Sequence, residues 1–378
     1  MLILNERDMN HPAAGGAELH VFEIFSRLAS RGYDVRVISE LFEGAAEREE
    51  VMGVRVERVG RVPFYYAAAA AACRRATAAN EVDVVVECLN KLPFLSPMYS
   101  AAPVLGLSHH LFGTTAFQQV PFPIAVAVWA AEKAIPSVFR GHPFITISDS
   151  SKSDLVARGV DEDRVSVSLC GIRAPEVEAR LDVPRPMRVV YLGRLAHYKR
   201  VDVMLRALAE LRPRFPDLEV VIIGRGPAQP KLEQLAGEVG LAECTRFTGF
   251  VSDAERDELV AGARVCVCPS EKEGWGLTVI EANAVGTPVV AADAPGLRDS
   301  VRHEETGYLV RTGDVDGFAE RIGSLLEEEA SWRRMAEAAL EWSSHFDWDV
   351  AADEMAVALA GARQAGAVAS SATKGSAP

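Results

Sequence analysis

Short, almost continuously apolar runs alternate with stretches of helical periodicity along most of the chain. The runs lie at residues 1–5, 35–38, 83–86, 103–107 and 144–147 in the first half, and at 188–192, 219–223, 263–268 and 288–292 in the second. Strands that are apolar on both faces are typical of parallel sheets covered by helices on both sides. The first helix is expected over residues 17–31, where apolar residues from Val21 to Leu28 recur at helical spacing before Gly32. The pattern predicts an α/β fold of doubly wound parallel sheets.

The alternation pauses once, in a passage rich in proline and charge at residues 173–185. We therefore predict two tandem Rossmann-like domains, at residues 1–175 and 186–345. The end of the chain has a purely helical pattern, with a last helix expected at 346–362. The tail at 363–378 is rich in Ala, Ser and Gly, which predicts disorder.

The composition limits which partners and which cellular compartment are expected. With 378 residues, 49% of them hydrophobic and 25% charged, the chain is long enough for two globular domains. Its net charge of −13 argues against nucleic acid or an anionic membrane as the main partner, so any bound phosphate must meet a local cationic pocket. Six cysteines without a C-x-x-C pair, and no cleavable signal peptide, predict reduced thiols in the cytoplasm. The histidines show no metal-ligand spacing, which predicts that no metal is bound.

One apolar segment, Val120–Ala131, stands apart from the strand pattern. It contains two prolines and ends at Glu132 and Lys133, and it is too short to cross a bilayer. We expect no transmembrane segment and interpret this stretch as a core helix. The alternative is an apolar lip that meets a lipid-like acceptor, which leaves peripheral membrane contact open.

Two glutamates frame the most informative passage. Glu273 and Glu281 lie on either side of Gly-Trp-Gly-Leu-Thr-Val-Ile, after the strand at 263–268. We expect Glu273 in a glycine-containing turn and Glu281 in the opening turn of the next helix. Two carboxylates beside free backbone N–H groups suit a ligand that carries hydroxyls and phosphate. Alternatively both glutamates are helix caps, since Ser270-x-x-Glu273 and Thr278-x-x-Glu281 fit the capping-box pattern.

A second candidate site follows the strand at 188–192. The loop that begins at Gly193 contains Arg194 and Lys199 and ends where a helix begins near Val201. An arginine fork can bind a phosphate through two parallel hydrogen bonds, and a lysine adds a mobile positive charge. Exposed cations are common in loops, so this pattern alone is equally compatible with a solvated turn.

The N-terminal loop also has the composition of an anion site. Gly15 and Gly16 precede the first helix, so the backbone can approach a ligand at the positive end of the helix dipole. The loop is not a G-x-G-x-x-G fingerprint, which disfavours an NAD-dependent dehydrogenase. Glu40 nevertheless stands where such an enzyme holds a ribose, so the test does not exclude NAD. We interpret Gly224-Arg-Gly-Pro as a tight turn.

A histidine pair follows the strand at 103–107. His109 and His110 come directly after Ser108, at the carboxyl end of a parallel strand, where ligands bind in doubly wound folds. An imidazole there can hydrogen-bond a hydroxyl or a developing charge. The alternative is a neutral histidine whose hydrogen bonds are made with the backbone.

Taken in this order, the motifs resemble the retaining glycosyltransferases of family 4 (glycosyltransferase group 1), which have the GT-B architecture. The resemblance spans about residues 1–350, and the run from Glu273 to Val290 is its most specific part. The other segments that follow the family's order are Gly15–Glu18, His109, Ser148, Gly171–Ile172, Gly193–Leu195 with Lys199, Gly224-x-Gly226-Pro227 and Thr248–Gly249.

The resemblance implies an acceptor-side first domain, a second domain that binds a nucleotide-sugar donor, a cleft between them, and a final helix that crosses back to the first. It implies that Arg194 and Lys199 bind the donor diphosphate, that Glu281 accepts hydrogen bonds from the ribose and that Glu273 lies near the transferred sugar. The implied catalytic residues are Glu273, His109, Arg194 and Lys199. His110 is a less specific match, because many relatives have Asp or Gly there. The implied donor-binding residues are Gly15, Gly16, Gly193, Arg194, Lys199, Gly249, Glu273, Gly274, Gly276, Leu277, Thr278 and Glu281.

The expected reaction is transfer of a hexosyl group from a UDP- or GDP-sugar to a hydroxyl of a small-molecule, glycan or lipid-linked acceptor, in carbohydrate or natural-product biosynthesis. No cofactor is expected, because Arg194 and Lys199 would stabilise the departing diphosphate without a metal. With no clear nucleophile, attack from the leaving-group side would retain the anomeric configuration. The alternatives are a GT-B sugar-nucleotide epimerase or hydrolase, and a non-catalytic protein that binds sugar nucleotides.

Overall fold

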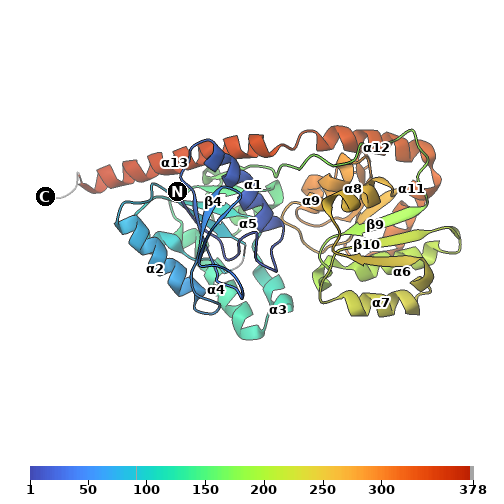
Figure 1. Cartoon of the computed structure of the whole chain (residues 1–378), viewed down its shortest axis with the longest axis horizontal. Coiled ribbons are helices and arrows are strands. Elements are labelled where there is room, and N and C mark those ends of the chain that lie inside the picture. Colours follow the sequence, from blue (N-terminus) through green and yellow to red (C-terminus); the bar gives the residue numbers. More distant parts are fainter. Residues whose placement is uncertain (91, 375–378) are drawn as a thin grey trace. The chain divides into compact units, whose positions relative to one another are not determined.

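The computed structural model describes residues 1–90 and 92–374, without the side chains of 114, 118, 119 and 367–374. The chain forms two compact units (Figure 1). Unit 1 comprises Met1–Gly171 together with the segment from Trp348, and unit 2 is the continuous segment Ile172–Asp347. The predicted α/β fold with two parallel-sheet units is confirmed.

Unit 1 contains an eight-stranded sheet in the order β3-β4-β2-β1-β5-β6-β7-β8. Its strands are β1 (Leu2–Leu4), β2 (Arg36–Ser39), β3 (Arg48–Val51), β4 (Val54–Arg58), β5 (Val85–Leu89), β6 (Val104–Ser108), β7 (Phe144–Thr146) and β8 (Val165–Val167). All neighbours are parallel except β3 and β4, which form an antiparallel hairpin at the edge. The apolar pattern missed this hairpin because β3 is a charged, exposed edge strand.

Helices cover the sheet of unit 1 and bury the predicted apolar stripes. They are α1 (Gly16–Ser30), α2 (Tyr65–Ala78), α3 (Ala116–Gln119), α4 (Phe122–Val138), α5 (Asp149–Ala157) and α13 (Trp348–Lys374), with 3₁₀ turns at Ser96–Met98, Gly113–Thr115 and Glu162–Arg164. The stripe of α1 from Val21 to Leu28 lies in the core. Helix α13 packs on α1, β6 and β7, and Arg31, directly after α1, donates to Asp349 (2.9 Å) and Asp353 (2.6 Å).

The end of the chain differs from the sequence prediction. Helix α13 continues to Lys374, so the expectation of disorder from residue 363 is wrong for the backbone up to that residue. The alanines of this stretch favour helix, and they extend a helix that is already anchored by packing. The remainder of the predicted tail, 375–378, lies outside the described residues.

Unit 2 contains a six-stranded parallel sheet in the order β11-β10-β9-β12-β13-β14. Its strands are β9 (Arg188–Leu192), β10 (Glu219–Ile223), β11 (Thr245–Gly249), β12 (Val265–Cys268), β13 (Val289–Ala292) and β14 (Gly307–Val310). Its helices are α6 (Val201–Leu211), α7 (Gln229–Glu238), α8 (Asp253–Ala261), α9 (Leu277–Ala284), α10 (Leu297–Ser300), α11 (Val315–Glu327) and α12 (Glu329–Ser343), with 3₁₀ turns at His197–Lys199 and Ala242–Cys244. Figure 1 shows α6 and α7 on one side of this sheet and α8 and α9 on the other.

Both sheets reverse their winding direction between two neighbouring strands. In unit 1 these are β1 and β5, and in unit 2 they are β9 and β12. Loops after such strands diverge to opposite faces, so ligands of doubly wound folds bind at the carboxyl ends of these strands. Within residues 1–90 and 92–374, no helix has the length and apolarity needed to span a membrane.

Candidate active site

An ion pair links the two loops at the reversal point of unit 2. Lys199 follows β9, Glu273 follows β12, and the Lys199 Nζ lies 2.5 Å from the Glu273 Oε1. Burial lowers the pKa of Lys199, but the Glu273 carboxylate and the neighbouring Tyr198 outweigh it, so the pKa is raised overall. Lys199 therefore remains a cation at neutral pH, as a diphosphate ligand would require.

Backbone and side-chain bonds fix these two loops to each other. The Glu271 N–H donates to the Tyr198 carbonyl (2.9 Å), and the Arg200 Nη1 donates to the Glu271 Oε1 (2.7 Å). Arg200 has φ near 50°, a strained left-handed conformation that its bonds to Glu271 and Asp202 stabilise. The loops are thereby preorganised around Lys199. Arg194 is exposed on the β9 loop, and its carbonyl accepts a bond from the Tyr191 hydroxyl (3.0 Å).

Glu281 lies in the second turn of α9, not in the opening turn as predicted. The helix begins at Leu277 because Gly276, with φ near 102°, provides the left-handed residue ahead of it. The capping-box interpretation is wrong: Ser270 precedes no helix, Thr278 is already inside one, and no side chain caps α9. Neither glutamate side chain therefore serves as a helix cap.

Arg256 of α8 is a neighbour of Glu281 that the sequence did not reveal. Its Nη1 lies 3.8 Å from the Glu281 Oε1, while its other bonds go to Asp253 and Asp257. Burial raises the pKa of Glu281; Arg256 opposes this rise, and Asp257 and Asp253 add to it. No spacing rule connects Arg256 to Glu281, because the two belong to different helices.

Glycines allow the carboxyl ends of neighbouring strands to approach closely. A Cβ on Gly224 would lie 2.0 Å from the Gly193 carbonyl oxygen, and one on Gly226 would lie 2.2 Å from the Leu195 carbonyl oxygen. The Gly224 N–H also donates to the Gly249 carbonyl (2.9 Å). Gly193 and Gly249 are thus brought to one edge through Gly224, which has the structural role expected of a tight turn.

The remaining donor-site candidates lie around the start of α9. Gly274 belongs to the turn between Glu273 and the helix, and Leu277 is the first residue of α9. Thr278 Oγ1 lies 3.6 Å from the Cys268 Sγ at the end of β12. A Cβ on Gly276 would lie 2.6 Å from the Ser300 Oγ, so a larger residue would displace the helix start.

In unit 1, His109 is buried and faces a second histidine. Its Nε2 lies 3.2 Å from the Nδ1 of His20 on α1, and the ring of Trp348 packs on His20 with centroids 5.7 Å apart. Burial, with smaller contributions from His20 and His110, holds the pKa of His109 well below its usual value, and burial lowers the pKa of His20 to about 3. Both rings are therefore neutral at physiological pH. His110 is half-buried, and its ring meets Phe112 edge to face.

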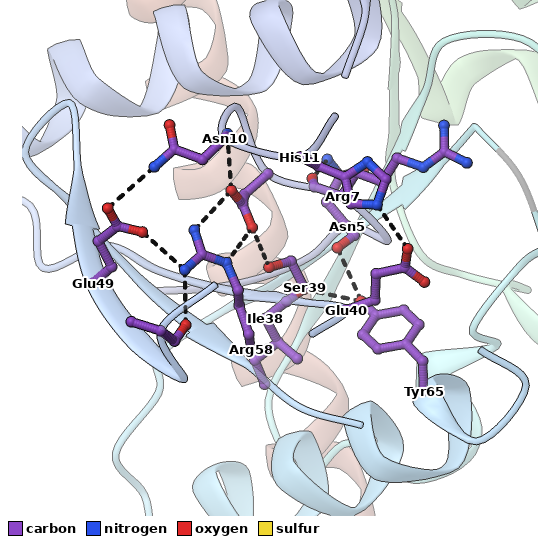
Figure 2. A network of polar contacts seen from close by, with 12 residues as sticks. Asn5, Arg7, Asn10, His11, Ile38, Ser39, Glu40, Glu49, Arg58 and Tyr65 are labelled. Atoms are coloured by element: carbon purple, nitrogen blue, oxygen red, sulfur yellow. Dashed lines mark hydrogen bonds and ion pairs between the residues drawn. The ribbon is translucent and has the colours of Figure 1, made fainter. Parts of the chain in front are cut away.

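The loop that presents Gly15 and Gly16 is held by a polar network (Figure 2). The side chains of Asp8 and Arg58 are fully buried and form two hydrogen bonds of 2.8 and 2.9 Å, and Ser39 donates to the same carboxylate (2.8 Å). Burial raises the pKa of Asp8, but bonds from Arg58, Ser39 and the Asn10 N–H outweigh it, so the pKa is lowered. This ion pair joins the loop after β1 to the end of β4.

A histidine in the same loop has a defined tautomer. The His11 Nδ1 accepts from the Ala13 N–H (3.0 Å), so the ring proton is on Nε2, which lies 2.9 Å from the Glu40 Oε1 (Figure 2). Glu40, which a dehydrogenase would need for its ribose, is thus paired within the protein. At the helix start, Glu18 accepts from the Gly15 N–H (2.8 Å). The sequence motif located Gly15 and Gly16 but not the residues that fix their loop.

No metal centre is formed by the residues that the structure describes: they contain no group of three or more His, Cys, Asp and Glu side chains arranged to hold a metal ion. The charged groups at the carboxyl edge of unit 2 include the cations Arg194 and Lys199 and the carboxylates Glu273 and Glu281.

Comparison with known proteins gives consistent matches over both units. Residues 14–176 match the model "Glycosyltransferase Family 4", and residues 177–342 match "Glycosyl transferases group 1". A D-inositol 3-phosphate glycosyltransferase of Nocardioides sp. is 30% identical, over 92% of this chain and 86% of the relative. Among solved structures, sucrose-phosphate synthase from Thermosynechococcus elongatus has a TM-score of 0.78 at 23% identity, over 94% of this chain and 96% of that one. Anabaena HepE in complex with UDP-glucose has a TM-score of 0.76 at 21% identity, over 95% and 99%.

Proposed function

The chain belongs to family 4 of the glycosyltransferases, and on that premise we propose that it moves a hexosyl group from a nucleotide-diphosphate sugar to an acceptor hydroxyl, with retention of configuration and without a metal ion. The observation that carries the proposal is the Lys199–Glu273 pair at the reversal point of the unit 2 sheet. It combines a permanent cation with a carboxylate at the edge where ligands of this fold class bind. HepE binds UDP-glucose, which makes a UDP-sugar the first donor to test and a GDP-sugar the second.

The cations act on the leaving group. As the bond between the anomeric carbon and the diphosphate oxygen breaks, negative charge grows on the diphosphate and positive charge on the sugar ring. Arg194 and Lys199 bind the diphosphate more strongly as its charge grows, which lowers the barrier. This role replaces the one that a divalent cation has in other transferases, so chelator treatment should leave transfer unchanged.

The carboxylates act on the sugar and the ribose. Glu273 orients the transferred sugar and stabilises the ring charge, and Glu281 accepts hydrogen bonds from the ribose hydroxyls. The acceptor oxygen bonds to the anomeric carbon on the face that the diphosphate leaves, and its proton passes to the departing diphosphate oxygen. His109 of unit 1 is the candidate partner for a sugar hydroxyl.

The first experiment is a substitution at the ion pair. We expect Lys199→Ala to reduce kcat by on the order of 10²–10³-fold, because a cation that stabilises the leaving group is lost. Transfer is measured with UDP- and GDP-sugars chosen by a thermal-shift panel, since a bound donor raises the Tm. The matched control is Lys231→Ala, an exposed lysine on α7 of the same unit. Near-normal turnover in Lys199→Ala would contradict the role assigned to Lys199 in stabilising the leaving group.

Three further measurements test retention, metal independence and transfer itself. Anomeric NMR of the product tests retention, and activity in EDTA tests metal independence. Donor incubated without acceptor distinguishes transfer from the alternatives: rapid hydrolysis or epimerisation would favour a hydrolase or epimerase. Donor binding without transfer to any acceptor would favour a binding protein.

A further inference from the structure

The α3–α4 segment of unit 1 exposes an apolar surface that the sequence analysis assigned to the core. From Leu111 to Ala131 the chain contains no charged residue. The exposed large side chains, with their exposed fractions, are Phe117 (41%), Val120 (37%), Phe122 (72%), Ile124 (52%), Val126 (40%) and Trp129 (41%). The core interpretation is therefore wrong. We refer to these six residues as the apolar face.

The inner side of the segment is too small to account for this composition. Among the side chains that the structure describes, Ala116, Ala125 and Val128 form a small buried cluster against Leu92 and Phe112, and Ile135 of α4 joins a larger core cluster of unit 1. An isolated exposed hydrophobic residue needs no explanation, but six exposed large apolar side chains between residues 117 and 129 mark an interaction surface.

The base of the segment is held firmly by a buried charge. Glu132 is fully buried, accepts from the N–H groups of Phe112 (2.6 Å) and Gly113 (2.8 Å), and pairs with Arg158 of the α5 C-terminus (3.1 Å). These bonds tie α4 back to the loop after β6. These bonds fix the position of α4 in unit 1. The apolar face is therefore exposed in the folded unit itself.

Charge at the end of the apolar face indicates what covers it. Glu132 is the sole acidic residue of α4, and it is buried, whereas Lys133 is exposed one turn after Trp129 and Arg140 is exposed just beyond the helix end at Val138. The Lys133 Nζ lies 5.6 Å from the centre of the Trp129 ring. A tryptophan beside a lysine, at the border between apolar and cationic surface, is typical of a segment at a lipid–water interface. This local charge is positive although the whole chain carries −13.

We propose that the apolar face of α3–α4 enters the interfacial layer of an anionic lipid bilayer, with Lys133 and Arg140 at the lipid headgroups. The inference deepens the proposed function: it selects a lipid-linked acceptor from the acceptor classes, and that part rests on the chain being a transferase. The segment follows His109 and His110 directly in the chain. The loop that carries the candidate sugar-binding histidine therefore also leads into the membrane-binding surface.

Vesicle flotation of the full-length protein tests the proposal. We expect binding to vesicles of phosphatidylcholine with phosphatidylglycerol, and weaker binding to phosphatidylcholine alone. Phe122→Asp should reduce binding by about tenfold or more, because it places a charge in the apolar layer. Lys133→Glu combined with Arg140→Glu should abolish the preference for anionic vesicles. The matched control is Val357→Asp, an exposed apolar residue (74%) on α13 of the same unit, which should bind normally.

Activity assays distinguish membrane binding by the apolar face from the proposed transfer reaction. With donor and a lipid-linked acceptor in vesicles, Phe122→Asp should lose transfer while the Tm increase with UDP stays unchanged. If the wild type binds vesicles but transfers no sugar, the membrane-binding role of the apolar face is supported and the proposed function is overturned. Transfer to soluble inositol phosphate at the same rate in wild type and Phe122→Asp, with no vesicle binding, would overturn the membrane surface. Dimerisation that Phe122→Asp abolishes would assign the apolar face to a second copy and also overturn it.

Discussion

At the residue scale, the buried histidine pair determines how His109 presents its ring. Because both rings are neutral, one nitrogen of the 3.2 Å contact carries the proton and the other accepts. The choice fixes whether the opposite nitrogen of His109, which has no partner among the described residues, is a donor or an acceptor. His20 is therefore a positioning residue that acts through His109.

Substitutions at His20 test this coupling. His20→Leu fills the volume but removes the hydrogen-bond partner, and we expect kcat to fall about tenfold with little change in the donor KM, since a buried bond of roughly 1–3 kcal/mol is lost. His20→Asn keeps a polar group near the Nδ1 position and should recover part of the loss. Equal activity of the Leu and Asn variants, with Tm values that match the wild type, would contradict the coupling.

The raised pKa of Glu281 predicts a pH dependence of donor binding. The carboxylate accepts ribose hydroxyls best when it is ionised, so donor affinity should fall as the pH falls through a pKa above the usual value of 4.5. Below that midpoint the Kd should rise about tenfold per pH unit. Calorimetry with a nucleotide sugar measures this curve.

Arg256 sets the midpoint of that curve. Arg256→Ala removes the cation that opposes the pKa rise, so the midpoint should move to higher pH. Glu281→Gln should flatten the dependence, and Glu243→Gln, an exposed glutamate of the same unit, is the control. A curve in Arg256→Ala that coincides with the wild type would contradict the electrostatic account.

The sequence located the candidate residues that lie in motifs, but not those that orient them. Lys199 and Glu273 could be found because each follows a predicted strand of a parallel sheet. His20, Arg256 and Asp8 could not, because their partners are distant in the chain and no spacing rule links them. Glu281 was placed one turn too early because the role of Gly276 as the residue ahead of the helix was not recognised.

At the element scale, the junction of β9 and β10 depends on the absence of a side chain. Gly224 combines φ near 127° with a Cβ position 2.0 Å from the Gly193 carbonyl oxygen. Gly224→Ala should therefore reduce the free energy of unfolding of unit 2 by about 3 kcal/mol or more, and donor binding with it. Gly237→Ala is the matched control, since this helical glycine has open space around its Cβ position and should gain about 0.5–1 kcal/mol. Chemical denaturation of both variants checks the contrast, and similar effects in the two would refute it.

Elements with an apolar run were predictable, and those with an unusual environment were not. The predicted apolar runs correspond to β1, β2, β5, β6, β7, β9, β10, β12 and β13, whereas the parallel strands β8, β11 and β14 lie outside them. The β3–β4 hairpin was not predicted, because β3 is charged and contains no apolar run. Helix α4 was misassigned because apolar composition alone does not distinguish a buried helix from one that exposes an apolar face.

At the scale of the whole molecule, one unit is continuous in the chain and the other is not. Unit 2 is a single segment between the two parts of unit 1, and α13 supplies the second part. Helix α13 buries Ala351, Ala352, Met355 and Leu359 within unit 1. The core of unit 1 therefore depends on a helix that follows the whole of unit 2.

Truncation separates the two units energetically. A chain that ends at Asp347 should lose at least about 3 kcal/mol of the unfolding free energy of unit 1, since the buried face of α13 is absent. Unit 2 should remain folded, and UDP should still raise its Tm. A chain that ends at Ala362 keeps these buried residues and should match the full-length protein in calorimetry. Equal loss in both truncations would contradict the assignment of the stabilising contacts.

The discontinuity of unit 1 has a consequence during synthesis. As the ribosome makes the chain, Met1–Gly171 emerges first, yet its helical partner α13 emerges only after Asp347. Unit 2 can fold as soon as its own segment is free, whereas the first part of unit 1 must wait with an uncovered surface on α1, β6 and β7. The order of translation thus exposes the first part of unit 1 to chaperones and proteases until α13 is made, and unit 1 is complete only when α13 docks.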